Sequence, residues 1–358
     1  MIKHPLVSII INNYNYGHFL PFAIEGSMNQ TYPYLEVIVV DDGSSDNSHE
    51  IIASYRNQVV PLLKENGGQA STFNAGVEVS QGEIVIFLDA DDVLLPDTVQ
   101  RVVDAFRMNP GISKVQYALA LIDESGKLIG RVMPPRPLSS GDLRMHVLKY
   151  YSYGWPPTSG NAFPSHVLHR LLPIPEKEYR ISADMYLADL SVLLGPVVSL
   201  NKIGGYYRAH GKNYYSLIHN APGGQEDISR LRGFIHRIEI GHSYQQRLAQ
   251  ELGIIKKPQK LFQTWDLLSS KMTSLKLDPA NHPGKEETLI RLAARGALAA
   301  IKEPGYFPYQ RLVHAIWFIT MLLFPKKYAI SMAEKLYHPE KRGRMGQLLA
   351  KLKKRQIL

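Results

Sequence analysis

The sequence of 358 residues contains no cysteine. It can therefore form neither a disulfide framework nor a thiolate metal site, and this composition fits a reducing compartment. The N-terminal residues do not combine a charged leader with a long apolar core, so we expect no secretory signal. An apolar stretch from Leu312 to Phe324 is about a dozen residues long, whereas a helix needs about 20 to span a bilayer. We therefore expect a cytoplasmic protein without a transmembrane segment.

Outside one segment, the sequence also has little excess charge of either sign. The formal net charge is +9, and the segment from Pro325 to Leu358 has ten Lys and Arg against two Glu. The other 324 residues therefore carry about +1. A nucleic-acid-binding domain usually has basic residues across a folded face, so we expect no nucleic-acid partner. A basic tail indicates an anionic partner for the tail alone.

Strand-like and helix-like segments alternate over the first third of the chain. Short apolar, β-branched runs predict buried parallel strands at residues 6–11, 35–40, 59–63 and 84–88. Helical spacing predicts helices at residues 18–29, 46–55, 69–79 and 97–108. This alternation implies right-handed crossovers. We therefore predict an α/β fold with a mostly parallel sheet flanked by helices.

The alternation loosens after Pro110. We predict strands at residues 115–122, 128–132, 197–200 and 205–207, and a helix at residues 182–194. Strand signals then stop, and stretches with helical spacing follow, such as residues 228–252 and 286–302. The Pro222-Gly223-Gly224 break marks a boundary. The sequence therefore predicts a first domain over residues 1–215 and a helical C-terminal region over residues 216–358.

Acidic residues directly follow two of the predicted strands. Asp41-Asp42-Gly43-Ser44-Ser45-Asp46 follows the second strand, and Asp89-Ala90-Asp91-Asp92 follows the fourth. In an open α/β sheet, ligands bind beyond the carboxyl ends of the strands. Carboxylates gathered there repel one another unless a cation or a hydrogen-bonding ligand compensates, and a hard divalent cation is a natural solution. For residues 41–46, a simple turn or helix cap stays open as the alternative.

A glycine-containing segment, Asn66-Gly67-Gly68-Gln69-Ala70-Ser71, precedes the third predicted helix. Its glycines allow a close approach of the backbone, and a helix N-terminus favours an anion such as a phosphate. A plain turn explains the same residues.

Three motifs resemble those of family 2 glycosyltransferases and occur in the family's order. They are residues 7–15 (VSIIINNYN), 41–46 (DDGSSD) and 87–92 (FLDADD). The resemblance extends over about residues 5–215 and implies the GT-A fold, which is Rossmann-like. It also implies one in-line displacement with inversion, from a nucleotide-sugar donor to an acceptor hydroxyl. We expect a UDP-sugar as the donor and a saccharide or a lipid-linked acceptor.

The resemblance also assigns residues to the donor and to a metal. The implied donor-binding residues are Asn12, Tyr14, Asp41, Asp42, Gly68, Asp89, Asn161 and Arg208. Asn12, Tyr14 and Asp42 would hold the base and ribose, although the family often has Pro-Thr where this chain has Asn12-Asn13. Asp89 and Asp91 match the family's DXD motif and, with His210, would ligate Mg²⁺ or Mn²⁺ at the donor diphosphate.

A further segment, Ser182-Ala183-Asp184-Met185-Tyr186-Leu187, resembles the part of the family that carries the catalytic base. The resemblance makes Asp184 the group that accepts the proton of the acceptor hydroxyl. The family often has a second carboxylate at the position of Ala183. From the residues alone, Asp184 is explained as a stabiliser of the first turn of a helix capped by Ser182.

Two other functions stay open at this point. A sugar-1-phosphate nucleotidyltransferase is also an α/β, metal-dependent enzyme, but it usually has a Gly- and Arg-rich loop where this chain has residues 12–15 (NNYN). A non-catalytic sugar-binding or scaffolding module would keep the fold without the chemistry, and Ala183 and Asn12-Asn13 are its support.

The apolar stretch and the basic tail together predict peripheral contact with the inner face of an anionic membrane. The alternative is a buried helix followed by a solvated tail.

Overall fold

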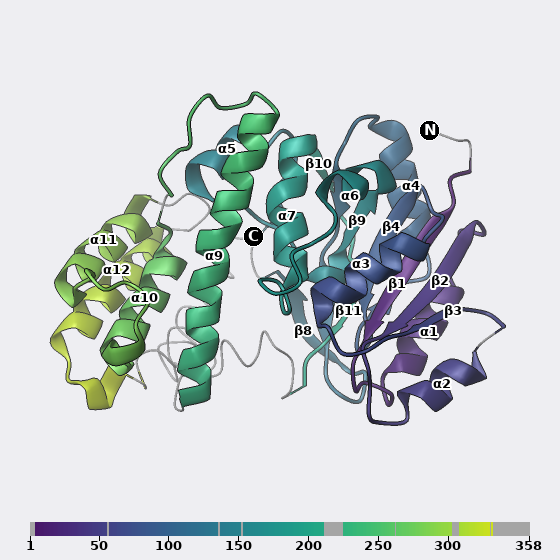
Figure 1. Ribbon diagram of the computed structural model, residues 1–358, viewed down its shortest axis with the longest axis horizontal. Coiled ribbons are helices and arrows are strands. Elements are labelled where there is room, and N and C mark those ends of the chain that lie inside the picture. The colour runs from purple at the N-terminus through teal and green to yellow at the C-terminus, as the bar shows by residue number, and fades with distance from the viewer. Residues whose placement is uncertain are drawn as a thin grey trace. The chain divides into compact units, whose positions relative to one another are not determined.

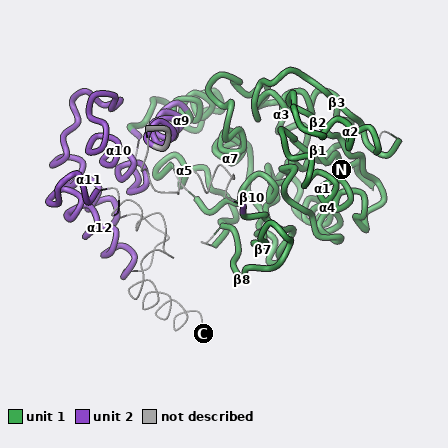
Figure 2. Tube along the Cα trace, turned by 90° about the horizontal axis from the view of Figure 1, so that it is seen from below, with its two compact units in different colours: residues 1–209, 241–260 green, residues 210–240, 261–358 purple. Residues whose placement is uncertain are grey.

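The computed structural model describes residues 4–55, 57–134, 137–151, 153–210, 225–261, 263–302, 308–329 and 331. The chain divides into two compact units (Figure 2). The first unit comprises residues 1–209 and 241–260, and the second comprises residues 210–240 and 261–358. The boundary predicted between residues 215 and 216 falls in 211–224, outside the described residues, and stays a prediction.

The first unit is built on a seven-stranded sheet with the order β10-β6-β9-β4-β1-β2-β3 (Figure 1). Its strands are β1 (Val7–Asn13), β2 (Leu35–Asp41), β3 (Val60–Leu63), β4 (Ile84–Asp89), β6 (Lys114–Gln116), β9 (Asn161–Pro164) and β10 (Val197–Ser199). β1 pairs in parallel with β2 and β4, β2 with β3, and β10 with β6. β9 runs antiparallel between β4 and β6. The predicted mostly parallel α/β sheet is therefore confirmed.

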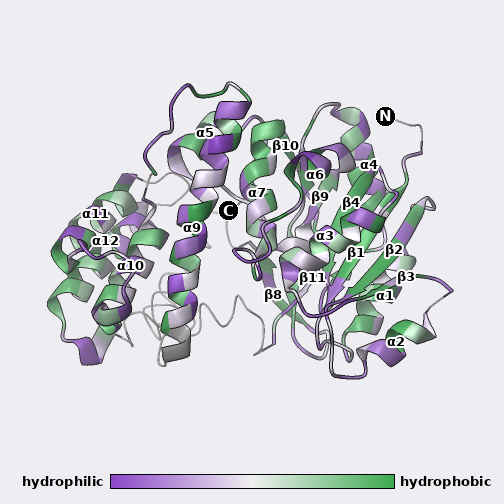
Figure 3. Cartoon of the chain, viewed as in Figure 1, coloured by the Kyte–Doolittle hydropathy of each residue, from purple (hydrophilic) through white to green (hydrophobic). Residues whose placement is uncertain are grey.

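Helices cover both faces of this sheet. They include α1 (Leu20–Met28), α2 (Ser48–Ser54), α3 (Gln69–Val79), α4 (Thr98–Met108), α5 (Arg144–Tyr150), α6 (Ser165–Leu171) and α7 (Ala183–Leu194). Ile9 of β1 belongs to one core cluster with residues of α1 and α4. Its neighbour Ile10 points to the other face, where a Cβ on Gly76 of α3 would overlap the Ile10 side chain. Because successive strand residues face opposite sides, burial of both faces explains why the strands β1, β2 and β4 are mainly apolar (Figure 3).

The single strand predicted at residues 115–122 is wrong. The structure divides it into β6 of the large sheet and β7 (Leu119–Ile122) of a four-stranded sheet. That second sheet has the order β5-β11-β7-β8 and is completed by β5 (Val93–Leu94), β8 (Leu128–Met133) and β11 (Gly205–Arg208). The chain leaves the first sheet at Tyr117, whose ring packs so closely on Gly204 that a Cβ there would overlap it. This contact between distant residues sets the break, and no local sequence signal marks it.

The second unit is helical, and its described residues form no strand. It contains α10 (Trp265–Leu277), α11 (Leu289–Lys302), α12 (Pro308–Leu323) and the first part of α9 (Gln225–Glu251), whose remainder belongs to the first unit. Met272, Leu292 and Phe318 lie in one buried cluster that joins α10, α11 and α12. The predicted helical C-terminal region is confirmed. None of the described helices has the length and apolarity required to cross a membrane.

Candidate active site

The loop that follows β4 holds the acidic motif in a fixed conformation. The Asp92 carboxylate is fully buried and accepts hydrogen bonds from Ser159 Oγ at 2.6 Å and from the backbone N–H of Arg208 at 3.0 Å. Ser159 Oγ in turn accepts the backbone N–H of Asp89 at 3.1 Å. Burial, followed by the charges of Asp91 and Asp89, raises the pKa of Asp92. Asp92 therefore organises the loop, and the side chains of Asp89 and Asp91 are the ones that can serve a ligand.

Arg208 of β11 also supports the loop that follows β4. Its Nε donates to the backbone oxygen of Asp91 at 3.0 Å, and its guanidinium lies over the rings of Phe19 and Phe22 at 4.7 and 5.2 Å. The side chain is buried. The structure thus gives Arg208 a scaffold role, and its predicted contact with the donor stays a prediction.

Asp89 lies among other acidic groups. Asn12 Nδ2 donates to its Oδ1 at 2.8 Å. Burial, then the charges of Asp91 and Asp184, raises the pKa of Asp89 to about 7 against the hydrogen bonds it accepts. Asp91 and Asp184 are therefore both within electrostatic reach of Asp89. A cation among them would stabilise the charged carboxylates, because an opposite charge favours ionisation.

The structure identifies Gln69, the first residue of α3, as a link that the sequence interpretation missed. Gln69 Oε1 accepts the backbone N–H of Ala183 at 2.9 Å. Its Nε2 lies 3.4 Å from Asp89 Oδ1 and 3.3 Å from Thr158 Oγ1. One side chain therefore joins the end of β4, the short 3₁₀ helix Thr158–Gly160 and the start of α7. The only local signal was its place in the glycine-containing segment before α3.

Asp184 lies in the first turn of α7 and is half-buried. Its Oδ1 accepts the backbone N–H of Met185 at 2.9 Å, as expected of a residue that stabilises a helix start. Its charge also contributes to the raised pKa values of Asp89 and Asp189, so this carboxylate is within electrostatic reach of the acidic motif. Ser182 occupies the N-cap position of α7, but its side chain makes no capping hydrogen bond, so the predicted Ser182 cap is wrong. The role of Asp184 as base stays a prediction.

Asp42 occupies the anion position that the glycine-containing segment provides. Its carboxylate is buried and accepts the backbone N–H groups of Gly67 at 2.9 Å and Gly68 at 2.7 Å, as well as Lys64 Nζ at 2.9 Å. The backbone N–H groups before α3 therefore bind the carboxylate of Asp42, a side chain of the protein itself. The predicted donor contacts of Asp42 and Gly68 stay predictions beside this structural role.

We expect Gly68→Ala to destabilise the first unit strongly. Gly68 has a φ of +89°, and a Cβ there would overlap Cγ and the carbonyl oxygen of Arg180. Gly111 is a matched control, because its φ is +83° and a Cβ there would meet no atom within 4 Å. We expect Gly111→Ala to cost about 1 kcal/mol from backbone strain alone. Gly68→Ala should cost about 3 kcal/mol, and equal losses in thermal unfolding would contradict the proposed overlap.

Asp41 is fully buried in the turn after β2 and has internal partners. It accepts Asn13 Nδ2 at 2.6 Å and Ser44 N–H at 2.9 Å, and it contacts His49 Nε2 at 2.8 Å. Burial opposes the change, but the hydrogen bonds from Ser44, Asn13 and His49 lower the pKa of Asp41. These contacts agree with the alternative that residues 41–46 form a simple turn. The donor-binding role of Asp41 stays a prediction.

The remaining predicted residues lie in different environments. Tyr14 is 49% exposed beside the end of β1. Asn161 is buried, accepts Lys114 Nζ at 3.0 Å and donates to the backbone oxygen of Pro157 at 2.8 Å. His210 is buried and belongs to the second unit. Among the described residues, no three His, Asp or Glu side chains gather closely enough to form a metal site by themselves.

Lys114 is a buried cation that the sequence interpretation did not single out. Besides Asn161, its Nζ donates to Tyr153 Oη at 2.9 Å. Burial lowers its pKa to about 7 against the charges of Asp189 and Asp184. Burial likewise raises the pKa of Asp189 to about 7. Lys114 therefore bonds to Tyr153 and Asn161 and is within electrostatic reach of Asp184 and Asp189 of α7.

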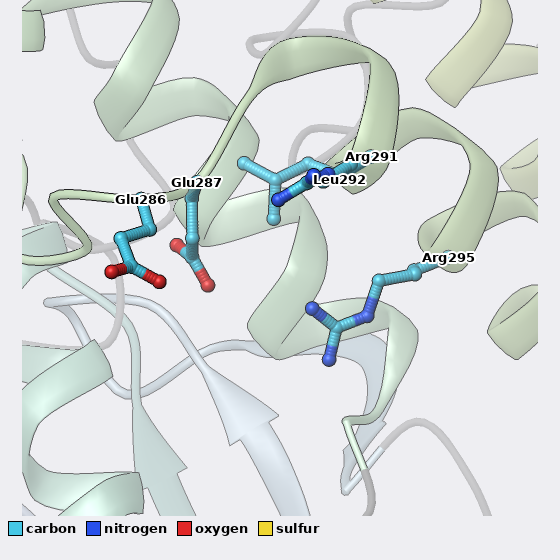
Figure 4. A pocket seen from close by; sticks show the side chains of 5 residues that line it. All are labelled: Glu286, Glu287, Arg291, Leu292 and Arg295. Carbon is cyan, nitrogen blue, oxygen red and sulfur yellow. The ribbon is translucent and has the colours of Figure 1, made fainter.

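A cavity of about 200 Å³ lies within the second unit (Figure 4). It is lined by Glu286, Glu287, Arg291, Leu292 and Arg295. Ligand pockets usually have volumes of about 300 to 1,000 Å³, and none of the predicted site residues lines this cavity. We therefore do not assign the donor to it.

Comparisons with known proteins agree with the motifs. A family model described as glycosyl transferase family 2 matches residues 8–130. An uncharacterized glycosyltransferase of Nostoc sp. is 34% identical over 273 residues, which cover 73% of this chain and 84% of that protein. Chondroitin synthase of Escherichia coli is 31% identical over 217 residues, covering 58% of this chain and only 30% of the synthase.

Among solved structures, the crystal structure of S. aureus TarS 1-349 in complex with UDP-GlcNAc has a TM-score of 0.50 at 16% identity. The match covers 94% of this chain and 90% of that one. At this identity the likeness concerns the fold, and it agrees with a mostly parallel sheet flanked by helices.

Proposed function

Since this chain belongs to glycosyl transferase family 2, we propose that it transfers a sugar from a nucleoside-diphosphate sugar to an acceptor hydroxyl with inversion. The observation that carries the proposal is the Gln69 side chain, whose Nε2 lies 3.4 Å from Asp89 Oδ1 and whose Oε1 accepts the backbone N–H of Ala183, the residue before Asp184. A glycosyltransferase needs a group for the donor diphosphate and a base for the acceptor at one place. The process that we propose is polysaccharide or glycolipid synthesis for the cell surface.

The donor that we propose is a UDP-sugar, the class bound in the TarS complex. Asn12 and Asp42 lie at or beside the carboxyl ends of β1 and β2, where an α/β sheet binds its ligand. Tyr14 is exposed at the same end and offers a ring for stacking on the base.

The residues at the acidic loop fit a Mg²⁺ or Mn²⁺ ion. Carboxylate oxygens are the ligands that these cations prefer, and the negative charges of Asp91 and Asp184 add to burial in raising the pKa of Asp89. Asp89 and Asp91 would hold the ion. When bound, the ion supplies positive charge for the leaving diphosphate.

The chain's own residues have separate tasks in this proposal. Asp184 accepts the proton of the acceptor hydroxyl. The hydroxyl oxygen attacks the anomeric carbon, whose bond to the nucleoside diphosphate breaks. Gln69 holds the backbone of Ala183 and thereby sets the start of α7. Asp92, with Ser159 and Arg208, keeps the acidic loop in position.

The acceptor is proposed by class only, as a saccharide or a lipid-linked sugar. A lipid-linked acceptor would account for membrane contact through the basic tail at residues 325–358. Residues 332–358 of that tail lie outside the described residues.

The experiment that tests the function is a donor screen. The protein is incubated with UDP-, GDP-, dTDP- and CDP-sugars, with and without Mn²⁺, and nucleotide release and thermal unfolding are measured. A nucleotide that binds only the folded state stabilises it by about 2.7 kcal/mol at 100 times its dissociation constant. We expect stabilisation and release with UDP-sugars in the presence of metal. A folded sample that responds to none of these donors would contradict the proposal.

A further inference from the structure

Helix α12 has two faces with different tasks. Its buried face consists of His314, Ala315, Trp317, Phe318 and Met321, and it contributes to the core of the second unit. The opposite face presents Leu312, Ile316, Ile319 and Leu323, whose exposed fractions range from 48% to 72%. These positions are spaced by four, three and four residues, so they form one stripe along the helix. The helix therefore has a complete core face and an additional aliphatic stripe.

The neighbouring helix α11 repeats this arrangement. Leu298 and Ile301 are 51% and 54% exposed, while Leu292 and Ala300 are buried in the core. Its other exposed side chains include Arg291, Arg295 and Lys302. The exposed surface of α11 thus combines an aliphatic stripe with a basic edge. α11 and α12 pack on each other (Figure 1), so both stripes belong to one structural element.

Basic residues predominate in the sequence of these two helices and of the segment after them, although Glu286 and Glu287 line the same cavity as Arg291 and Arg295 (Figure 4). Between Leu289 and Tyr328 the sequence has six Lys and Arg and a single acidic residue, Glu303. Neither helix contains an Asp or Glu, and Lys326 and Lys327 are exposed just beyond the end of α12. A second copy of the chain would oppose this surface with the same charge, which disfavours pairing. An anionic surface complements it.

We propose that the exposed stripes of α11 and α12 dock on the surface of an anionic lipid bilayer. Leu312, Ile316, Ile319 and Leu323 enter the headgroup region, and the neighbouring Arg and Lys side chains contact lipid phosphates. α12 has 16 residues, and no described helix is long and apolar enough to span a membrane. The contact is therefore peripheral. None of these residues belongs to the acidic site, so the test does not depend on the proposed transfer reaction.

The test is co-sedimentation of the full chain with vesicles of phosphatidylcholine and phosphatidylglycerol in equal amounts, or of phosphatidylcholine alone. We expect binding to the anionic vesicles only. Replacing Ile316 and Ile319 together by Gln should raise the apparent dissociation constant about tenfold. The matched control replaces Leu128 and Ile129 of β8 by Gln, since these residues are also exposed aliphatic neighbours, and its binding should equal that of the wild type.

A second variant tests the charge and also serves if the first fails to fold. Lys326→Gln combined with Lys327→Gln should weaken binding to anionic vesicles about tenfold, and added salt should have the same effect. A third variant neutralises Lys351, Lys353, Lys354 and Arg355 in the tail. The proposal is overturned if only this tail variant loses binding, if neutral vesicles bind equally, or if the Ile316 and Ile319 variant binds as the wild type does. It is also overturned if that variant instead converts a dimer to a monomer in light scattering.

Discussion

Asp184→Asn is expected to lower the turnover number about 100- to 10,000-fold, which is the usual contribution of a general base. An amide keeps an oxygen for the backbone N–H of Met185, which Asp184 Oδ1 accepts at 2.9 Å, but it cannot take up the acceptor proton. The start of α7 should therefore persist, and unfolding free energy should change by less than about 0.5 kcal/mol. The rate of nucleotide release in the presence of acceptor, measured beside donor affinity, separates the two effects.

The matched control for this variant is Asp189→Asn, on the same helix. The carboxylate of Asp189 is buried and accepts Tyr151 Oη at 2.8 Å, so its replacement changes packing contacts without removing a group that faces the acidic motif. We expect this variant to keep most of its turnover even where its stability changes. Near wild-type turnover in Asp184→Asn would show that its carboxylate only stabilises the helix. A product with retained anomeric configuration would exclude the single displacement.

The sequence was a good guide wherever local pattern and tertiary environment agree. The third helix was predicted at residues 69–79 and is found at Gln69–Val79. The parallel strands β1, β2 and β4 were predicted because both of their faces are buried, which requires a continuous apolar run. The acidic motifs were placed at the carboxyl ends of β2 and β4 because all parallel strands end at the same edge. These features follow from neighbours in the chain.

What the sequence did not predict depends on residues far apart in the chain. Ser159 bonds to Asp92 across 67 positions, and Gln69 bonds to Ala183 across 114. The strand β9 has four residues and no alternating pattern, and its place between β4 and β6 is fixed by the sheet. In the sequence, nothing distinguishes Lys114 from other charged residues. Its role depends on Tyr153 and Asn161, which the fold brings into contact with it. The supporting side chains of the site could therefore be identified only from the structure, whereas its acidic groups could be identified from the sequence.

Asp91 is one of the acidic groups of the site, and Asp91→Ala is expected to abolish the metal-dependent part of nucleotide binding. The loop should persist, because its conformation depends on the Asp92 carboxylate and on Arg208 Nε, which donates to the backbone oxygen of Asp91. In the wild type, Mn²⁺ with the nucleotide should stabilise the fold by about 2.7 kcal/mol at 100 times the dissociation constant. In Asp91→Ala we expect no additional stabilisation from Mn²⁺, measured by thermal unfolding.

The control for Asp91→Ala is Asp104→Ala, which removes an equal charge from a half-exposed position on α4. It should respond to Mn²⁺ as the wild type does, because its carboxylate is not part of the acidic loop. If both variants lost the metal response, general electrostatics would explain it. If Asp91→Ala kept the response, the ion would be held elsewhere, and the raised pKa of Asp89 would reflect only its burial and the neighbouring carboxylates. Loss in Asp91→Ala alone would mean that the ion depends on the Asp91 carboxylate in the acidic loop.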